Sequence, residues 1–401
     1  MNRLMIQAAL YIVVRVPLVC LLMSLANTPA QGGVLRRVQI VSSATGLQGA
    51  AISPDGSKVA IYLPNRLKIY DVSSLRVDAS VELPSVPEGR YVGGGEPESG
   101  VRYCDRGKYI LIYGGNATFF VIDAIGYRRT ATIDLDIPKA EETAATVIAG
   151  SCSAESNVAV IEVSPSQDDW VGAVKVFNLD SGRQTGEIPL GSRSIYWRGV
   201  DVSPSGSHAL IYLRDAGSPD TKIALLDIGS SKLSASIDTG FYGGQATFIG
   251  ESSIAVVGGH FLRFDTREVI KIFDAQTGAP TREIGDSTNA PKVAVDASAD
   301  GRFLFAYTGE ENYCGDCDEH SRGNLQIEHA RFTVWDLTTG RIVAQSPSIP
   351  FEKGHGRVAI FWKDPACCES TRPQFQFSQS GNAVLTTRIS YQDAVDVYLL
   401  K

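Results

Sequence analysis

Short apolar strands and polar turns alternate along this chain in a unit that recurs roughly every fifty residues. Six times an apolar strand ends in a polar turn that opens with Asp or Asn, and a shorter copy of the unit ends the chain. Because the aspartates of these turns recur with the unit, we predict that they stabilise turns rather than catalyse a reaction. The closing turns begin at Tyr70-Asp71, Ile122-Asp123, Phe177-Asn178, Leu226-Asp227, Phe273-Asp274 and Trp335-Asp336.

A second recurring turn resembles Ser-Pro-Asp-Gly, as at residues 53–56 and, with Ser in place of Asp, at residues 203–206, and its Gly supplies a positive φ. The strand after this turn is apolar throughout, as at residues 109–113 and 303–307. Such runs indicate a sheet that is covered on both faces, whereas the strands of a two-layer sandwich would alternate. Neighbouring repeats provide that cover in a β-propeller. The sequence therefore predicts an all-β propeller of four-stranded antiparallel blades.

The last repeat, residues 375–400, stops after three strands. Its missing fourth strand is available at residues 34–41, near the other end of the chain. Pairing the two ends closes the ring and removes its exposed edges. We therefore predict seven blades that form a single cooperative domain over residues 31–401.

The N-terminal segment combines Arg3 with a largely apolar stretch and then small residues, which is typical of an export signal. An uncleaved membrane anchor is the alternative, but Arg15 and Pro17 within the apolar stretch disfavour it. Cys20 lacks the preceding small residue that lipoprotein processing needs. We predict a cleaved signal at residues 1–30, a periplasmic or extracellular protein, and no membrane span after cleavage.

The charge balance changes this picture in one respect. The chain has 37 basic and 44 acidic residues, a net charge of −7, without a basic stripe. Nucleic acid is therefore not predicted as a partner.

Two segments carry a resemblance to a known family. Residues 332–340, Phe-Thr-Val-Trp-Asp-Leu-Thr-Thr-Gly, and residues 270–274, Ile-Lys-Ile-Phe-Asp, are its best matches. Over nearly the whole mature length the chain resembles the WD40-like and YVTN-type seven-bladed β-propellers of the quinoprotein-like superfamily. It departs from intracellular WD40 proteins because Trp335-Asp336 is its one Trp-Asp pair and a Gly-His partner dipeptide does not recur from blade to blade. The resemblance implies a looser propeller of the bacterial envelope, in a family that includes scaffolds, binding proteins and enzymes.

The mature chain has six cysteines, an even number that points to disulfides in an exported protein. Cys104 and Cys152 occupy equivalent turn positions in successive blades, which predicts a bridge between them. The other four fall in two insertions expected on one face, at residues 309–330 and 350–373. Two disulfides are predicted there, with a zinc site as the alternative. These four are Cys314, Cys317, Cys367 and Cys368.

Four of the segments that enter blades contain aromatic, His or Arg residues followed by Gly. They are expected around the central funnel, where such side chains suit a recognition surface; the alternative is that they pack between blades. The tentative ligand-binding residues are Arg90, Tyr91, Trp197, Arg198, Tyr242, His260, Arg263 and His355.

The chain contains no Gly-x-Ser-x-Gly or His-Glu-x-x-His motif. We therefore predict a non-enzymatic scaffold that binds a protein, peptide or glycan partner through its funnel face, without a metal or cofactor and with no prediction of its oligomeric state. The alternative is a propeller enzyme, such as a lactonase or quinoprotein-type oxidoreductase, that would use His260, Arg263 and Asp265.

Overall fold

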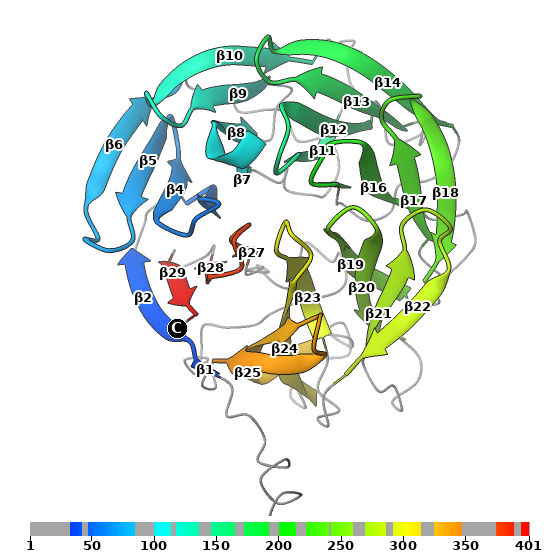
Figure 1. Ribbon diagram of the computed structural model, residues 1–401. Coiled ribbons are helices and arrows are strands. Elements are labelled where there is room, and N and C mark those ends of the chain that lie inside the picture. Colours follow the sequence, from blue (N-terminus) through cyan, green and yellow to red (C-terminus); the bar gives the residue numbers. More distant parts are fainter. Residues whose placement is uncertain are drawn as a thin grey trace, which may run out of the picture.

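A computed structural model of the 401-residue chain shows a ring of seven sheets, and Figure 1 shows these blades following one another in sequence order around the ring. The structure describes residues 33–41, 47–84, 100–113, 118–135, 146–164, 172–191, 200–213, 222–239, 242–259, 269–285, 292–313, 325–346, 374–388 and 394–400. Within these residues no helix is long and apolar enough to cross a membrane.

The first four blades each contain four antiparallel strands in sequence order from the ring axis outward. Blade one contains β3 (Gly49–Ile52), β4 (Lys58–Leu63), β5 (Arg66–Asp71) and β6 (Val77–Glu82). Blade two contains β7 (Gly100–Cys104), β8 (Tyr109–Tyr113), β9 (Thr118–Asp123) and β10 (Arg128–Asp134), with the 3-10 turn η1 (Asp105–Gly107). Blade three contains β11 (Thr146–Cys152), β12 (Val158–Ser164), β13 (Gly172–Asn178) and β14 (Arg183–Gly191). Blade four contains β15 (Val200–Val202), β16 (His208–Leu213), β17 (Lys222–Asp227) and β18 (Lys232–Asp238).

The last three blades complete the ring. Blade five contains β19 (Tyr242–Ile249), β20 (Ser253–Gly259), β21 (Ile270–Asp274) and β22 (Pro280–Ile284). Blade six contains β23 (Lys292–Ala297), β24 (Phe303–Tyr313), β25 (Leu325–Asp336) and β26 (Arg341–Gln345), with β1 (Gly33–Val34) added at its edge. Blade seven contains β27 (Gln374–Phe377), β28 (Ala383–Arg388) and β29 (Ala394–Leu399), and its outer strand is β2 (Arg36–Val41).

The chain ends close the ring as predicted, because β2 pairs antiparallel with β29. In Figure 1 the blue β2 lies beside the red β29. The predicted N-terminal strand is divided, however: Val34 pairs in parallel with Gln345 of blade six, and pairing with β29 begins at Arg36. The N-terminal segment thus attaches to two blades.

The described apolar core consists of separate clusters between adjacent blades, one for each of the seven seams. Strand β8 contributes side chains to two of these clusters. Leu111 packs toward blade three, whereas Ile110 and Ile112 pack toward blade one. All five residues of this strand are buried. The continuous apolar runs therefore serve two seams at once, which confirms the interpretation of the sequence.

The turns after the first strand of each blade and after the third lie at the same end of the ring, which we call the turn face. Gly56 and Gly206 have φ of 74° and 78°, so the predicted positive φ is present. The aspartates of the closing turns accept hydrogen bonds from turn N–H groups, such as Ser74 to Asp71 at 2.8 Å and Thr277 to Asp274 at 2.7 Å. These bonds confirm that the recurring aspartates stabilise turns.

Backbone hydrogen bonds also join the first turns of neighbouring blades around the turn face. Each bond runs from an N–H group in one blade to a carbonyl in another. A ring of turns tied in this way holds the inner ends of the blades together. The bonds run from Asp105 to Ser153 at 3.0 Å, from Glu155 to Pro204 at 2.8 Å, from Ala299 to Gln379 at 3.1 Å and from Ser380 to Pro54 at 2.9 Å.

The opposite end of the ring is the funnel face, where each blade is entered and where its second and third strands connect. The segments between successive blades here comprise residues 83–99, 135–145, 192–199, 239–241, 285–291, 346–373 and 42–48. Blade six differs from the others because β24 and β25 extend to 11 and 12 residues and remain paired as far as Tyr313 and Leu325. The arms of the predicted insertion at 309–330 therefore continue this hairpin.

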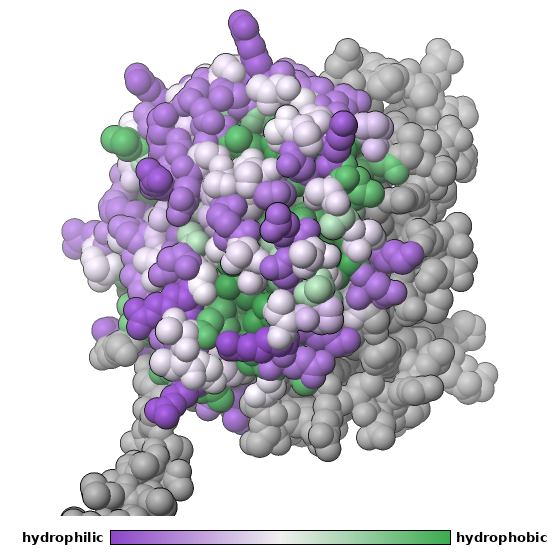
Figure 2. Space-filling view, turned by 45° about the vertical axis from the view of Figure 1, so that its right-hand side comes forward, coloured by the Kyte–Doolittle hydropathy of each residue, from purple (hydrophilic) through white to green (hydrophobic). Residues whose placement is uncertain are grey.

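Figure 2 shows one side of the molecule, whose coloured part is mainly purple and white, with smaller green apolar areas between them. Large hydrophobic side chains that are exposed among the described residues are Leu75, Val77, Ile125 and Leu233.

Candidate functional site

The side chains predicted to bind a ligand at the funnel face fall outside the described part of the chain. Tyr242 is a partial exception, because its backbone forms the first residue of β19. It therefore belongs to an inner strand, and not to the entry loop that its Gly-Gly sequence suggested. The others, Arg90, Tyr91, Trp197, Arg198, His260, Arg263 and His355, stay predictions.

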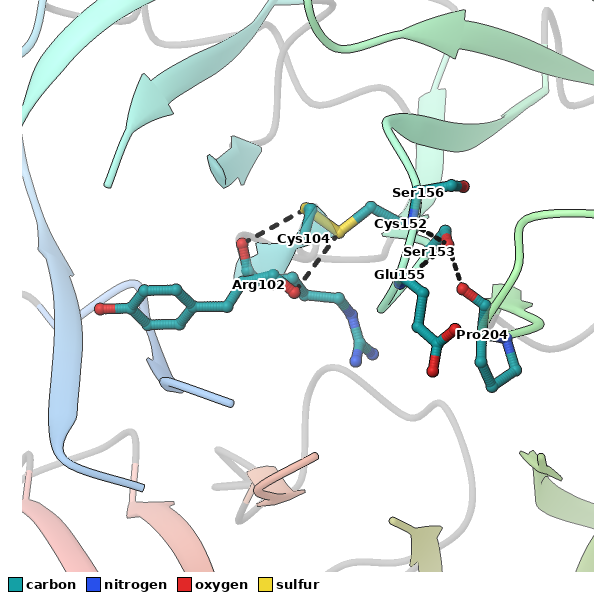
Figure 3. Close-up of a disulfide and its surroundings, with 8 residues drawn as sticks. Arg102, Cys104, Cys152, Ser153, Glu155, Ser156 and Pro204 are labelled. Carbon is teal, nitrogen blue, oxygen red and sulfur yellow. Dashed lines mark hydrogen bonds between the residues drawn. A yellow bond between two sulfur atoms is a disulfide. The ribbon is translucent and has the colours of Figure 1, made fainter. Parts of the chain in front are cut away.

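One cysteine pair lies at disulfide distance. Cys104 and Cys152 are joined, with their Cα atoms 5.6 Å apart, at the inner ends of β7 and β11 (Figure 3). Their positions are not equivalent: Cys104 matches Ser53 at the start of the turn, whereas Cys152 stands one residue earlier, before the matching Ser153. Successive residues of a strand face opposite sides. This offset therefore turns the two sulfur atoms toward the same seam, where both lie in one cluster.

Cys314, Cys317, Cys367 and Cys368 lie outside the described residues, so their disulfides stay a prediction. Within the described residues no group of three or more His, Cys, Asp or Glu side chains is placed to hold a metal ion.

Polar side chains gather on the inner strands two residues before the turn face, and this is the candidate site that the structure does describe. The position is polar in six of the seven blades. Since each blade repeats the same geometry, these residues stand at one level of the ring. We call the set the inner belt: Ala51, Arg102, Ser151, Asp201, Thr247, Asp296 and Gln376.

Members of the inner belt accept hydrogen bonds from the backbone of the next blade. The Asp201 carboxylate accepts the Phe248 N–H at 3.0 Å, and Asp296 accepts the Phe377 N–H at 2.7 Å. Between blades seven and one, Gln376 Oε1 accepts the Ile52 N–H at 2.9 Å. The inner edge of a blade has no further strand to pair with its N–H groups. The inner belt supplies these acceptors at three seams.

Arg102 is the member that donates rather than accepts. Its side chain is partly exposed, and its Nε atom is buried without a hydrogen-bond partner among the described residues. Figure 3 shows the side chain extending from β7 away from the disulfide and toward the interior of the ring. Burial acts to lower the pKa of this guanidinium, but Tyr113, Asp201 and Asp296 outweigh it and raise the pKa. Arg102 therefore remains charged.

A threonine connects the two carboxylates of the belt. Thr247 Oγ1 donates to Asp201 at 3.0 Å and also lies 3.5 Å from Asp296 Oδ1. Burial raises the pKa of Asp296 to about 6, and the Asp201 charge adds to this effect, while Phe377 N–H, Ala297 N–H and Arg102 oppose it. A protonated Asp296 can donate back to Thr247, whose own proton points to Asp201. The site thus changes its charge near neutral pH.

The inner belt was not predicted from the sequence, although a signal for it exists. Inner strands are otherwise apolar or small near the turn, yet Arg102, Asp201 and Asp296 recur at one fixed distance before it. Aligning the repeats on the turn would have brought these residues into one column.

No family model matches the chain, and no curated protein matches it either.

Proposed function

We propose that this chain is an exported, non-enzymatic β-propeller that binds a protein, peptide or glycan partner through its funnel face. Among propellers we place it with the WD40-like and YVTN-type proteins, on the strength of its turns and of Trp335-Asp336. The observation that carries the proposal is the contrast between the two faces of the ring.

The turn face is built from short connections that satisfy one another. Its turns use their own Asp and Ser side chains as caps, and their backbones bond across the seams. The funnel face instead has the longer connections, such as residues 83–99 and 346–373, together with the extended β24–β25 hairpin. A rigid scaffold with variable segments at one end is the arrangement by which loops carry recognition. This contrast supports binding at the funnel face.

A pair of matched variants tests the proposal. One variant replaces the predicted funnel-face residues Trp197 and Arg198 with Ala, and the other replaces Ile125 and Arg128 with Ala. The control residues lie near the turn face, with Ile125 83% exposed and the Arg128 side chain 81% exposed. Both variants remove one large apolar and one Arg side chain. Peptide-display and glycan-array selections on the wild-type protein provide the probe.

The proposal expects the funnel-face variant to lose at least tenfold in affinity, because aromatic and Arg anchors dominate interface energies by about 2 kcal/mol or more each. The control variant should bind as the wild type does. Loss of binding in the control alone would place recognition on the turn face and contradict the proposal.

Export is tested separately, because it concerns the N-terminus. Expression of the full chain in a secreting host followed by N-terminal sequencing should give a mature start between Asn27 and Gln31. An intact Met1 in membrane-bound protein would favour the anchor instead.

A further inference from the structure

The charged residues of the inner belt stand on alternate blades around the axis. Arg102 is on blade two, Asp201 on blade four and Asp296 on blade six, each two residues before the turn face. All three residues are partly exposed, although they lie on the innermost strands.

Their hydrogen-bonding capacity is only partly used. Arg102 Nε lacks a partner among the described residues, whereas Tyr113 interacts with the guanidinium and helps to raise its pKa. Asp201 accepts two bonds, from Thr247 and Phe248, and both go to Oδ2. Asp201 Oδ1 accepts none from any described residue. A buried donor without an acceptor is costly, so these groups favour a ligand that completes them.

The mixture of charges restricts what that ligand is. An anion would pair with Arg102 but would face two carboxylates, and a cation would pair with the carboxylates but would face Arg102. Either conflict is stronger inside a protein than in water. A neutral ligand with several hydroxyl groups avoids both, because each hydroxyl accepts a bond from Arg102 or donates one to a carboxylate.

We propose that the inner belt binds a neutral saccharide unit, with Arg102 donating to its oxygens and Asp201 and Asp296 accepting from its hydroxyls. The inference rests on the proposed binding function and selects the glycan among its three partner classes, but it places the site on the innermost strands two residues before the turn face rather than in the funnel-face segments. The disulfide at Cys104, two residues after Arg102 on β7, anchors the strand that positions the guanidinium.

Calorimetric titration of the full-length mature protein tests the proposal. The probes are neutral oligosaccharides of glucose, galactose and N-acetylglucosamine, with galacturonate oligomers as the anionic probe and glucosamine oligomers as the cationic one. Variants are Arg102→Met, Arg102→Lys and Asp201→Asn, with Arg128→Met as the matched control. Thermal melting of each variant verifies that it is folded.

We expect a neutral oligosaccharide to bind more tightly than either charged probe. Arg102→Met should weaken it at least tenfold, Arg102→Lys less, and Arg128→Met not at all. Asp201→Asn should weaken oligosaccharide binding only severalfold, since the new amide side chain keeps one oxygen that can accept the Phe248 N–H. Equal binding by wild type and a folded Arg102→Met variant would overturn the proposal. So would tightest binding of galacturonate or glucosamine, or no saccharide binding at all.

The Trp197/Arg198 variant separates this inference from the proposed function. If it loses the selected partner while the wild type binds no saccharide, the funnel-face function stands and the belt site is wrong. If the variant keeps both the selected partner and the saccharide, and saccharide binding is lost in Arg102→Met, the belt site stands and recognition by the funnel face is wrong.

Discussion

Two seams of the ring are held in different ways. Between blades two and three, neighbours in sequence, the disulfide between Cys104 and Cys152 crosses the inner strands. Between blades seven and one no disulfide is present among the described residues, and Gln376, Ser380 and Asn382 bond to the backbone of blade one at 2.9 Å each.

The belt residues at these two seams differ as well. Gln376 has an acceptor for the N–H group of the next blade, whereas the guanidinium of Arg102 has donors only. The seam after Arg102 lacks such an acceptor and is crossed instead by the disulfide and by the hydrogen bond from Asp105 N–H to the Ser153 carbonyl at 3.0 Å. Asp180 adds to it from blade three, accepting from Lys108 Nζ at 2.9 Å and from the Tyr109 hydroxyl. Repeated blades thus use individual solutions at their seams.

The largest expected effect is at the closure. Deleting residues 34–41 removes the outer strand of blade seven and the buried side chains of Leu35 and Ile40. The loss should be roughly 5 kcal/mol of unfolding free energy, since each such side chain contributes about 1.5–3 kcal/mol and β29 becomes an exposed edge. Thermal and chemical denaturation measure it. Deleting residues 1–32 is the control, and equal stability of the two deletions would contradict closure by β2.

The disulfide should contribute less to the unfolding free energy than the closure by residues 34–41 does. Replacing Cys104 and Cys152 together with Ala should cost about 2–4 kcal/mol, because the bridge spans a sequence separation of 48 and restricts the unfolded chain. Denaturation under non-reducing conditions gives the value, with peptide mapping to verify the bridge in the wild type. A double variant as stable as the oxidised wild type would show that the seam does not depend on it.

Gln376 gives a smaller test at the other seam. Gln376→Ala leaves the Ile52 N–H without its acceptor and should cost about 1–2 kcal/mol, because the site is partly exposed and water compensates in part. Gln376→Glu keeps an acceptor oxygen and should retain most of the stability. If both variants lose the same unfolding free energy, the hydrogen bond from the Ile52 N–H does not stabilise this seam.

The raised pKa of Asp296 predicts that the unfolding free energy depends on pH, with a change as large as that expected for Gln376→Ala or smaller. Its pKa of about 6 in the folded protein is above the ordinary value of 3.8, so the folded protein holds a proton that the unfolded chain releases. This group therefore lowers stability as pH rises from about 4 to 6. Relative to wild type, Asp296→Asn should gain about 1–2 kcal/mol between pH 4 and pH 8, after allowance for partial exposure. A difference that does not change with pH would contradict the shifted pKa.

The sequence predicted the architecture because its signals are local. Apolar runs such as Tyr109–Tyr113 and turns such as residues 53–56 report their structure within a few residues. The contacts at the seams between blades were harder to predict from the sequence, since they join residues of different repeats. Cys104 and Cys152 were paired from apparent equivalence, but a one-residue offset is what makes their side chains meet. The belt was missed because Arg102 and Asp296 acquire meaning only when the blades are superposed.

The central claim is that β2 and β29 close the ring and that each seam has its own stabilising contacts. Hydrogen–deuterium exchange of the unmodified mature protein, measured peptide by peptide, tests this claim most directly. The account predicts that β2 and β29 exchange as slowly as the paired strands of blades one to six. It also predicts protection of the Ile52, Phe248 and Phe377 N–H groups, which bond to the inner belt. Rapid exchange of β2 and β29 while the other blades stay protected would contradict the closed ring.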